Sequence, residues 1–355
     1  MGNPLENYNI HICLESELLE LQQFINEHWK SNHALAKSKK LLDWQHYDEE
    51  NQLYNFVIAK HLKTNEIHGI LGFIPTSHFD KSIRNVDLWL VIWKVRDDVK
   101  HLGLGLALRE YIIFLKQPRS ISGFGIAPGA LQIHKYLGCK AGILNHWYLV
   151  NKQITDFHLI GNFHGQYHSG LTMESEKKLI QYEKSDFFQL SGESKNIIPN
   201  NQIPEKSHDF LYHRYYCHPI YNYYVYGIKS QDSIVGILVF RLSSHNSYHA
   251  LRIVDYFGNT TGLSGLFDEL QRLLEYYNAE YIDFYNIGIE EINLTTSGFI
   301  RRDSTSKVII PNYFEPFEKK NIDLDYIYYI YKCDNNFNFY IFKGDSDQDR
   351  PNLIL

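Results

Sequence analysis

The sequence has 355 residues, of which 44% are apolar and 15% aromatic, and its formal net charge is −6. A chain of this length exceeds one ordinary hydrophobic core, so we expect two domains. The acidic balance argues against nucleic acid as a partner. No apolar stretch approaches the roughly 18 residues that span a bilayer, and the first residues lack a secretory signal pattern. We therefore expect no membrane insertion.

Cysteine and histidine usage excludes two further kinds of protein. The four cysteines are scattered without C-x-x-C pairs, which indicates neither a disulfide framework nor a zinc site and suits a cytoplasmic protein. The 18 histidines include no H-E-x-x-H motif. The sequence therefore predicts no metal site.

The first elements predict the beginning of an α/β domain. Residues 8–13 alternate apolar and polar side chains as a strand does, and Ser16 can cap a helix that extends to Trp29. Residues 54–60 and 67–73 predict two strands of a hairpin, because a turn-rich link joins them.

The next stretch carries the strongest functional signal. Residues 86–95 are almost wholly apolar and predict a buried strand, after which a polar break leads to Gly103, Gly105 and a helical run. Glycines between a strand and a helix let helix N–H groups point at an anion such as phosphate. The spacing is neither G-x-G-x-x-G nor that of a P-loop, because Leu108 takes the third glycine's place and no Gly-Lys-Ser/Thr follows.

The pattern Lys100-x-x-Gly103-x-Gly105 resembles the acyl-coenzyme A pyrophosphate loop of the GNAT superfamily of N-acetyltransferases, Arg/Gln-x-x-Gly-x-Gly/Ala, with Lys in the first place. The elements that follow agree in order: a strand at 120–126, a short helix from Pro128, and a strand at 146–150. The corner at 136–139 has Cys139 where the family has Phe. The resemblance covers about residues 8–150 and implies an α/β fold with a mixed sheet.

The resemblance implies acetyl-CoA, or another acyl-CoA, as cofactor. It places the cofactor on residues that end the central strand and begin the helix: Val95, Lys100, His101, Leu102, Gly103, Leu104, Gly105 and Leu106.

Acyl transfer from a thioester to an amine needs a base, an N–H donor for the oxyanion and a proton for the leaving thiolate. The resemblance maps the N–H donor to the backbone at about Val95. Asp87 is the acid within the central strand, so it is the candidate base, although it equally fits a strand-end residue that faces water. His134 stands where the family has its tyrosine acid, and the step can also proceed without an acid.

Two segments are candidates for binding the acceptor. His33, Asp43, Trp44 and His46 lie where the resemblance implies an acceptor pocket, or they belong to a surface helix. Residues 206–221 are dense in polar aromatic side chains, which suit a sugar or a nucleotide and equally suit a tyrosine-rich core helix. Within the second segment the candidates are Arg214, Tyr215 and His218.

The second half repeats the first in outline, since Gly236 and Gly298 follow Gly69 and Gly138 at similar distances. Its loop at 259–265 has glycines three apart and no basic lead residue, so we expect a related fold with a degenerate cofactor loop. The expected domains are 1–165, binding acyl-CoA, and 166–355, forming a wall of the acceptor site. Acids alternate at 343–349 without the calcium-loop pattern, so this tail is expected to cap the acceptor site or to be disordered.

Three functions fit these patterns. The first is an acyl-CoA dependent N-acyltransferase of two GNAT-like domains, whose likeness to surface-glycan enzymes implies a nucleotide-linked amino sugar as acceptor. The second is an amide-forming ligase like the Fem-type aminoacyl transferases. The third is a non-catalytic protein that binds sugar nucleotides. The sequence gives no oligomeric state.

Overall fold

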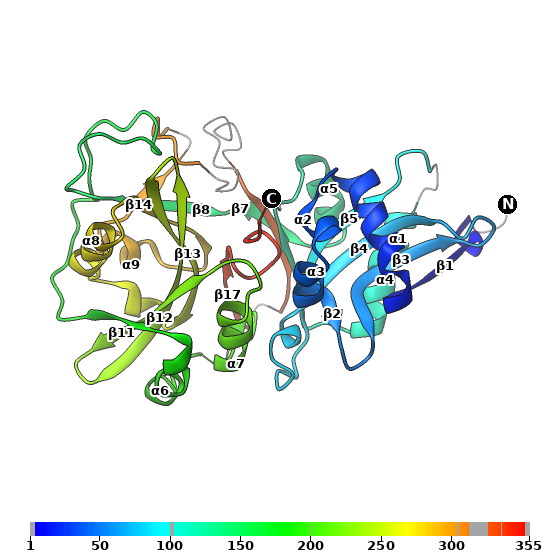
Figure 1. Cartoon of the computed structure of the whole chain (residues 1–355), viewed down its shortest axis with the longest axis horizontal. Coiled ribbons are helices and arrows are strands. Elements are labelled where there is room, and N and C mark those ends of the chain that lie inside the picture. Colours follow the sequence, from blue (N-terminus) through cyan, green and yellow to red (C-terminus); the bar gives the residue numbers. More distant parts are fainter. Residues whose placement is uncertain are drawn as a thin grey trace. The chain divides into compact units, whose positions relative to one another are not determined.

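The computed structural model describes residues 4–99, 103–199, 201–303, 305–311, 326–334 and 336–351. The chain divides into two compact units (Figure 1). The first comprises the described residues up to Ala141 with those of 330–335 and 350–355, and the second comprises those of 142–329 and 336–349. Two mixed eight-stranded sheets form the framework, which confirms the predicted α/β class with two related domains.

The first sheet has the order β1-β3-β4-β5-β6-β16-β7, with β2 paired to β3. Neighbours from β1 to β5 are antiparallel, whereas β5 and β6 are parallel. The strands are β1 (Tyr8–Leu14), β2 (Tyr47–Asp48), β3 (Leu53–His61), β4 (Ile67–Pro75), β5 (Asp87–Val95), β6 (Ser120–Phe124), β7 (Lys140–Ile143) and β16 (Tyr328–Lys332).

Apolar side chains cover both faces of this sheet. On one face Leu21 and Leu42 pack with Phe56, and on the other Leu104 and Leu108 pack with strand residues. This arrangement explains the helical spacing of the apolar residues after Gly103. The helical segments are η1 (Pro4–Asn7), η2 (Glu15–Glu17), α1 (Leu18–Phe24), η3 (Ile25–Trp29), α2 (Ala34–Lys37), α3 (Lys39–His46), η4 (Thr76–His78), α4 (Leu104–Lys116) and α5 (Pro128–Tyr136).

The second sheet has the order β15-β8-β14-β13-β12-β11-β9, with β18 paired to β14, and β10 and β17 form a separate parallel pair. The strands are β8 (Asn145–Val150), β9 (Lys178–Tyr182), β10 (Gln202–Ile203), β11 (Tyr223–Ser230), β12 (Ser233–His245), β13 (Tyr248–Gly258), β14 (Ala279–Ile287), β15 (Ile300–Arg302), β17 (Asn338–Phe339) and β18 (Ile341–Phe342).

The order strand, strand, loop, helix, parallel strand, helix occurs in both units. In the second unit it runs β12, β13, η7, α8, β14, α9, and leucines of α8 pack on the sheet in one core. The helical segments here are η5 (Lys184–Asp186), α6 (Phe187–Glu193), α7 (His208–Leu211), η6 (Tyr212–Tyr216), η7 (Thr260–Leu263), α8 (Phe267–Tyr276) and α9 (Glu291–Thr295). Among all described helices, none combines the length and apolarity of a membrane span.

The strand at 146–150 lies in a different sheet from the one expected. The sequence predicts it as the closing strand of the first domain, but β8 pairs with β14 and β15 of the second sheet. The units therefore separate between Ala141 and Gly142 rather than at 165. Apolar alternation identifies a strand but not its partner, which explains the difference.

Candidate functional site

The central strand β5 separates from its parallel neighbour β6. Their pairing is limited to Asp87 with Ser120, Leu88 with Ile121 and Trp89 with Ser122. On its other edge, β5 has a register shift against β4: Leu90 pairs with Phe73 and Trp93 with Leu71, so two residues of β5 oppose the single residue Gly72 of β4. Such a bulge bends a strand and increases its twist. The second half of β5 consequently leaves an open splay beside β6.

The backbone N–H of Val95 points toward this splay. Arg96 donates its N–H to the carbonyl of His68, on the β4 side, at 2.9 Å. Successive N–H groups of a strand point to opposite edges, so the N–H of Val95 faces the β6 side. This is the donor position that the resemblance implies.

Helix α4 begins at the same end of β5. Gly103 precedes it with φ of +93°, a left-handed conformation that suits glycine. The helical hydrogen bonds begin with the N–H of Ala107 to the carbonyl of Gly103. The N–H groups of Leu104, Gly105 and Leu106 therefore have no acceptor within the helix, and N–H groups at a helix start are able to bind an anion. Lys100, His101 and Leu102 lie outside the described residues.

A cleft of about 670 Å³ lies where these parts meet. Its lining is mostly apolar, and it comes from the end of β5, the start of α4 and the outer side of α5. The lining residues are Trp93, Val95, Gly103, Gly105, Leu106, Ala130, Gln132, Ile133 and Tyr136. The structure thus brings Val95, Gly103, Gly105 and Leu106 of the predicted cofactor set to one cavity.

His134, the predicted acid, lies behind this cleft. Its side chain is 2% exposed, packs edge-on against Trp93 at 5.2 Å between ring centroids, and is not part of the cleft lining. Burial, assisted by the charge of Arg109, lowers the pKa of His134 to about 4, so the ring is neutral near pH 7. Tyr136, 89% exposed, lines the cleft instead.

Asp87, the predicted base, lies at the opposite end of β5. Eight residues of extended strand separate it from Val95, about 26 Å. Its carboxylate is 1% exposed and accepts hydrogen bonds from Arg119 Nε at 3.0 Å and Ser120 Oγ at 2.7 Å. Asp87 therefore joins β5 to the start of β6, and the structure does not bring it to the cleft.

The acceptor candidates of the first unit have local structural contacts. His33 Nδ1 caps α2 by accepting the N–H of Leu35, and burial lowers its pKa to about 2. Asp43 accepts from Tyr54 Oη at 2.6 Å, and Trp44 packs on Phe79. His46 is fully buried, which lowers its pKa well below the usual value. None of these four side chains lines the cleft.

Two of the three candidates of the second unit, Arg214 and Tyr215, belong to its interior. Arg214 Nε donates to the carbonyl of Gly344 at 3.0 Å, and Tyr215 Oη donates to Asp255 at 2.5 Å. His218 Nδ1 accepts the N–H groups of Ile220 and Tyr221. Arg214 and Tyr215 thus serve a buried polar network, as the core-helix alternative predicts, whereas the half-buried His218 holds a local turn.

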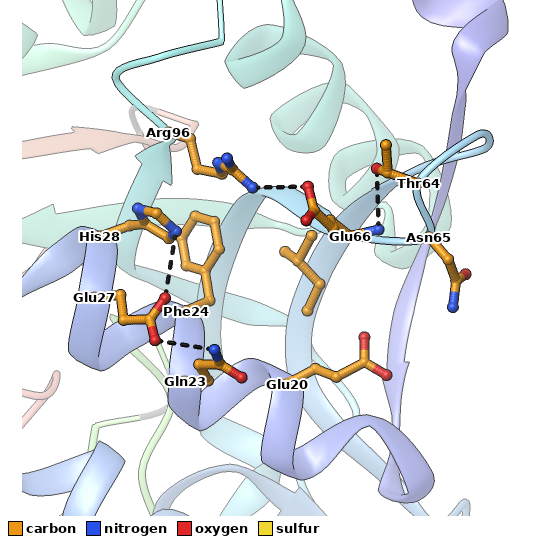
Figure 2. A pocket seen from close by; sticks show the side chains of 10 residues that line it. Glu20, Gln23, Phe24, Glu27, His28, Thr64, Asn65, Glu66 and Arg96 are labelled. Atoms are coloured by element: carbon orange, nitrogen blue, oxygen red, sulfur yellow. Dashed lines mark hydrogen bonds and ion pairs between the residues drawn. The ribbon is translucent and has the colours of Figure 1, made fainter.

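A second pocket of the first unit, of about 350 Å³, lies between α1, η3 and the turn that joins β3 to β4 (Figure 2). Three carboxylates line it, and each has a partner. Glu66 pairs with Arg96 at 3.2 Å, Glu27 accepts from Gln23 at 2.9 Å, and Glu20 pairs with Lys60 at 2.8 Å. Its acidic groups are therefore compensated within the fold. Across the described ranges, no cluster of three or more His, Cys, Asp or Glu is placed to hold a metal.

In the second unit, the place that corresponds to the splay is filled by the chain. Pairing of β13 with β14 runs from His249 to Ile253, after which β14 pairs with β18. The N–H of Gly344 then donates to the carbonyl of Val254 on β13 at 2.8 Å. The segment after Asn336 is therefore packed inside this unit as far as Asp349, which makes the expectation of a disordered tail wrong for these residues.

The corresponding loop of the second unit has the opposite polarity. Lys177 Nζ donates to the carbonyls of Thr261, Gly262 and Ser264 at 3.2, 3.1 and 2.7 Å. A loop that holds an ammonium with carbonyl oxygens presents acceptors where a diphosphate needs donors. Ser175 Oγ also donates to the carbonyl of Gly265. The spacing of this loop predicts a degenerate cofactor loop. In the structure its carbonyl oxygens accept hydrogen bonds from Lys177 and Ser175.

Comparison with solved structures identifies the same fold. A GCN5-related N-acetyltransferase from Anabaena variabilis matches with a TM-score of 0.52 and 10% identity, over 92% of this chain and 72% of that one. One from Kribbella flavida matches with 0.53 and 9%, over 93% and 72%. A conserved protein of unknown function from Enterococcus faecalis matches with 0.54 and 8%, over 92% and 72%. No family model and no curated protein matches the sequence. At these identities the likeness establishes the fold alone: that of GCN5-related N-acetyltransferases.

Proposed function

We propose that this chain is an N-acyltransferase that binds acyl-CoA in the cleft of its first unit and transfers the acyl group to a primary amine. One observation carries the proposal: the splay of β5 from β6 and the glycine-led start of α4 open into the same apolar cleft. The splay offers an N–H donor for a carbonyl oxygen, and the helix start offers N–H donors for a diphosphate.

The residues of the cleft fit the cofactor. A Cβ on Gly103 would meet no atom of the described residues within 4 Å, so among those residues nothing occupies the space beside Gly103 that a phosphate group would take. The apolar walls suit the pantetheine arm, and bound acyl-CoA would supply an activated thioester. The acyl group is proposed to be acetyl.

We assign the chain's own groups as follows. The N–H of Val95 would stabilise the oxyanion, and the hydroxyl of Tyr136, which lines the cleft, is the better placed donor for the leaving thiolate than His134. His134 acts, if at all, as a neutral ring, and its Nδ1 has no hydrogen-bond partner among the described residues. Asp87 has a structural role.

The substitution Asp87→Asn tests that last assignment. It should lower the free energy of unfolding by about 1–3 kcal/mol, because Arg119 loses its charged acceptor. The turnover number of the folded enzyme should stay within about twofold of wild type, since the residue lies away from the cleft. Urea denaturation and steady-state kinetics measure the two effects. A large loss of turnover with unchanged stability would restore Asp87 as the base.

In the second unit, β18 fills the place that corresponds to the splay, so we expect each chain to bind one acyl-CoA. Isothermal titration with acetyl-CoA should give a stoichiometry of one, and Lys177→Met should leave it unchanged, because β18 still fills the space beside β14. A stoichiometry of two in either protein would contradict this reading of the second unit.

The acceptor we propose is an amino sugar, linked to a nucleotide and used in surface polysaccharide biosynthesis in the cytoplasm. This assignment is supported only by the resemblance of the sequence. An aminoacyl ligase and a non-catalytic sugar-nucleotide binder are the alternatives.

The proposal is tested by release of free CoA thiol and by the mass of the acceptor. The chain should consume acetyl-CoA in the presence of a UDP- or dTDP-amino sugar and add one acetyl group to it, and the same sugar with its amine already acetylated is the control. Binding of the sugar nucleotide without thiol release, or transfer from aminoacyl-tRNA alone, would overturn the proposal in favour of one alternative.

A further inference from the structure

We propose that Trp93 closes the inner end of the cleft, restricts the acyl group to a short chain, and holds Gly105 in place at the start of α4. This inference rests on the proposed function. Trp93 follows the bulge of β5 and precedes Val95 by two residues on the same face of the strand, since both side chains line the cleft.

The indole of Trp93 contacts each wall of the cleft. Its Nε1–H donates to the carbonyl of Gly105 at 3.1 Å, in the first turn of α4. Its ring packs edge-on against His134 of α5 at 5.2 Å. A side chain that belongs to the strand and reaches both helices must separate the open part of the cleft from the space behind it.

The position of the ring fixes the room for an acyl chain. Two residues of strand are about 7 Å, so a chain that starts beside Val95 and continues along β5 soon meets the indole. Beyond it, the strands close again: Trp89 and Phe124 pack edge-on at 5.8 Å, and a Cβ on Gly123 would lie 3.1 Å from the carbonyl oxygen of Leu90. These contacts narrow the space between β5 and β6 beyond the indole.

The second role of the indole is to hold the first turn of α4 in place. Gly105 lies so close to Trp93 that a Cβ there would be 3.2 Å from Nε1. The hydrogen bond fixes the carbonyl of Gly105 and thereby the peptide groups whose N–H donors face the diphosphate. The two roles depend on different properties of the Trp93 side chain. The size of the indole limits the length of the acyl chain, and its Nε1–H orients Gly105 at the start of α4.

The test is the affinity of acetyl-, butyryl- and octanoyl-CoA, measured by isothermal titration without an acceptor. Wild type should bind octanoyl-CoA about 10-fold or more weakly than acetyl-CoA, and Trp93→Ala should shift the octanoyl-to-acetyl ratio by at least about 10-fold toward octanoyl. Trp93→Phe should keep the wild-type order and weaken all three by about 3- to 10-fold, because it removes one hydrogen bond.

Trp44→Ala is the matched control, because Trp44 is a half-buried tryptophan of the same unit that does not line the cleft. It should leave all affinities unchanged. If Trp93→Ala does not fold, as judged by circular dichroism, Trp93→Leu replaces it with the same expected direction. Equal binding of all chain lengths by wild type, or an unchanged order in the small-residue variant, would overturn the role of Trp93 while the proposed function stands. Failure of every acyl-CoA to bind wild type would overturn both.

Discussion

Gly103→Val should weaken the binding of acyl-CoA by at least about 10-fold. Gly103 has φ of +93°, which a β-branched residue adopts only at a cost, and the added side chain would enter the open space in front of the N–H groups of α4. Each charge-assisted hydrogen bond lost to the diphosphate is worth about 1.5–3 kcal/mol, so loss of one or two weakens binding by about 10- to 1000-fold or more. Isothermal titration with coenzyme A measures the effect directly.

Gly165→Val is the control for backbone strain. Gly165 has a similar φ of +95°, also with nothing within 4 Å of a Cβ, but it lies in a loop of the second unit. It should lower stability by an amount similar to Gly103→Val and leave coenzyme A affinity unchanged. Equal binding by wild type and Gly103→Val would show that the diphosphate does not rest on the start of α4.

Lys206→Met should destabilise the second unit more than any surface substitution. The Lys206 side chain is fully buried and forms ion pairs with Asp255, at 2.6 Å, and Asp345. Burial acts to lower the pKa of Lys206, but the two carboxylates outweigh it and raise the net value. Removing one partner of a buried ion pair costs about 3–5 kcal/mol, because the other charge remains buried and unpaired. Urea denaturation followed by tyrosine and tryptophan fluorescence measures the loss.

The pH dependence separates lost charge from lost packing. Burial raises the pKa of Asp345 already in wild type, and without Lys206 the Asp345 carboxyl should bind a proton still more readily in the folded state. A raised folded pKa means that the folded state holds protons which the unfolded state has released, so stability falls as pH rises above the unfolded value of about 4. The deficit of Lys206→Met should therefore be larger at pH 8 than at pH 5. A deficit independent of pH would indicate packing alone.

Lys39→Met is the matched control for this charge. Lys39 pairs with Asp43 at 2.6 Å on an exposed helix surface, where its side chain is 56% exposed. Surface pairs contribute about 0–1 kcal/mol, so little change is expected. A loss as large as that of Lys206→Met would mean that burial does not decide the effect.

The elements around the cleft were predictable because their signals are local. Residues 86–95 are apolar over their whole length, two glycines follow, and apolar residues then recur at helical spacing, which together give β5 and α4. Val95, Gly103, Gly105 and Leu106, which line one cavity, are named by the resemblance of this stretch to the GNAT loop. Trp93 and Tyr136 were missed, although their proximity to Val95 and Gly138 in the sequence was an available signal.

The remaining features depend on contacts between distant residues, which composition and spacing do not reveal. The sequence predicts Asp87 as a candidate base because it is an acid in the central strand, yet its contacts are set by Arg119, which comes 32 positions later. The strands β8 and β18 both pair with β14, which is distant from each of them in the sequence. Polar aromatic residues near Arg214 suggest a sugar site, whereas the carbonyl of Gly344 and the carboxylate of Asp255, both distant in sequence, make Arg214 and Tyr215 part of a core.

The most direct test of the account is a crystal structure of the chain with acetyl-CoA bound. The account predicts one cofactor, with diphosphate oxygens within hydrogen-bonding distance of the N–H groups of residues 104–106 and the thioester carbonyl beside the N–H of Val95. A cofactor bound in the second unit, or no cofactor at saturating concentration, would contradict it.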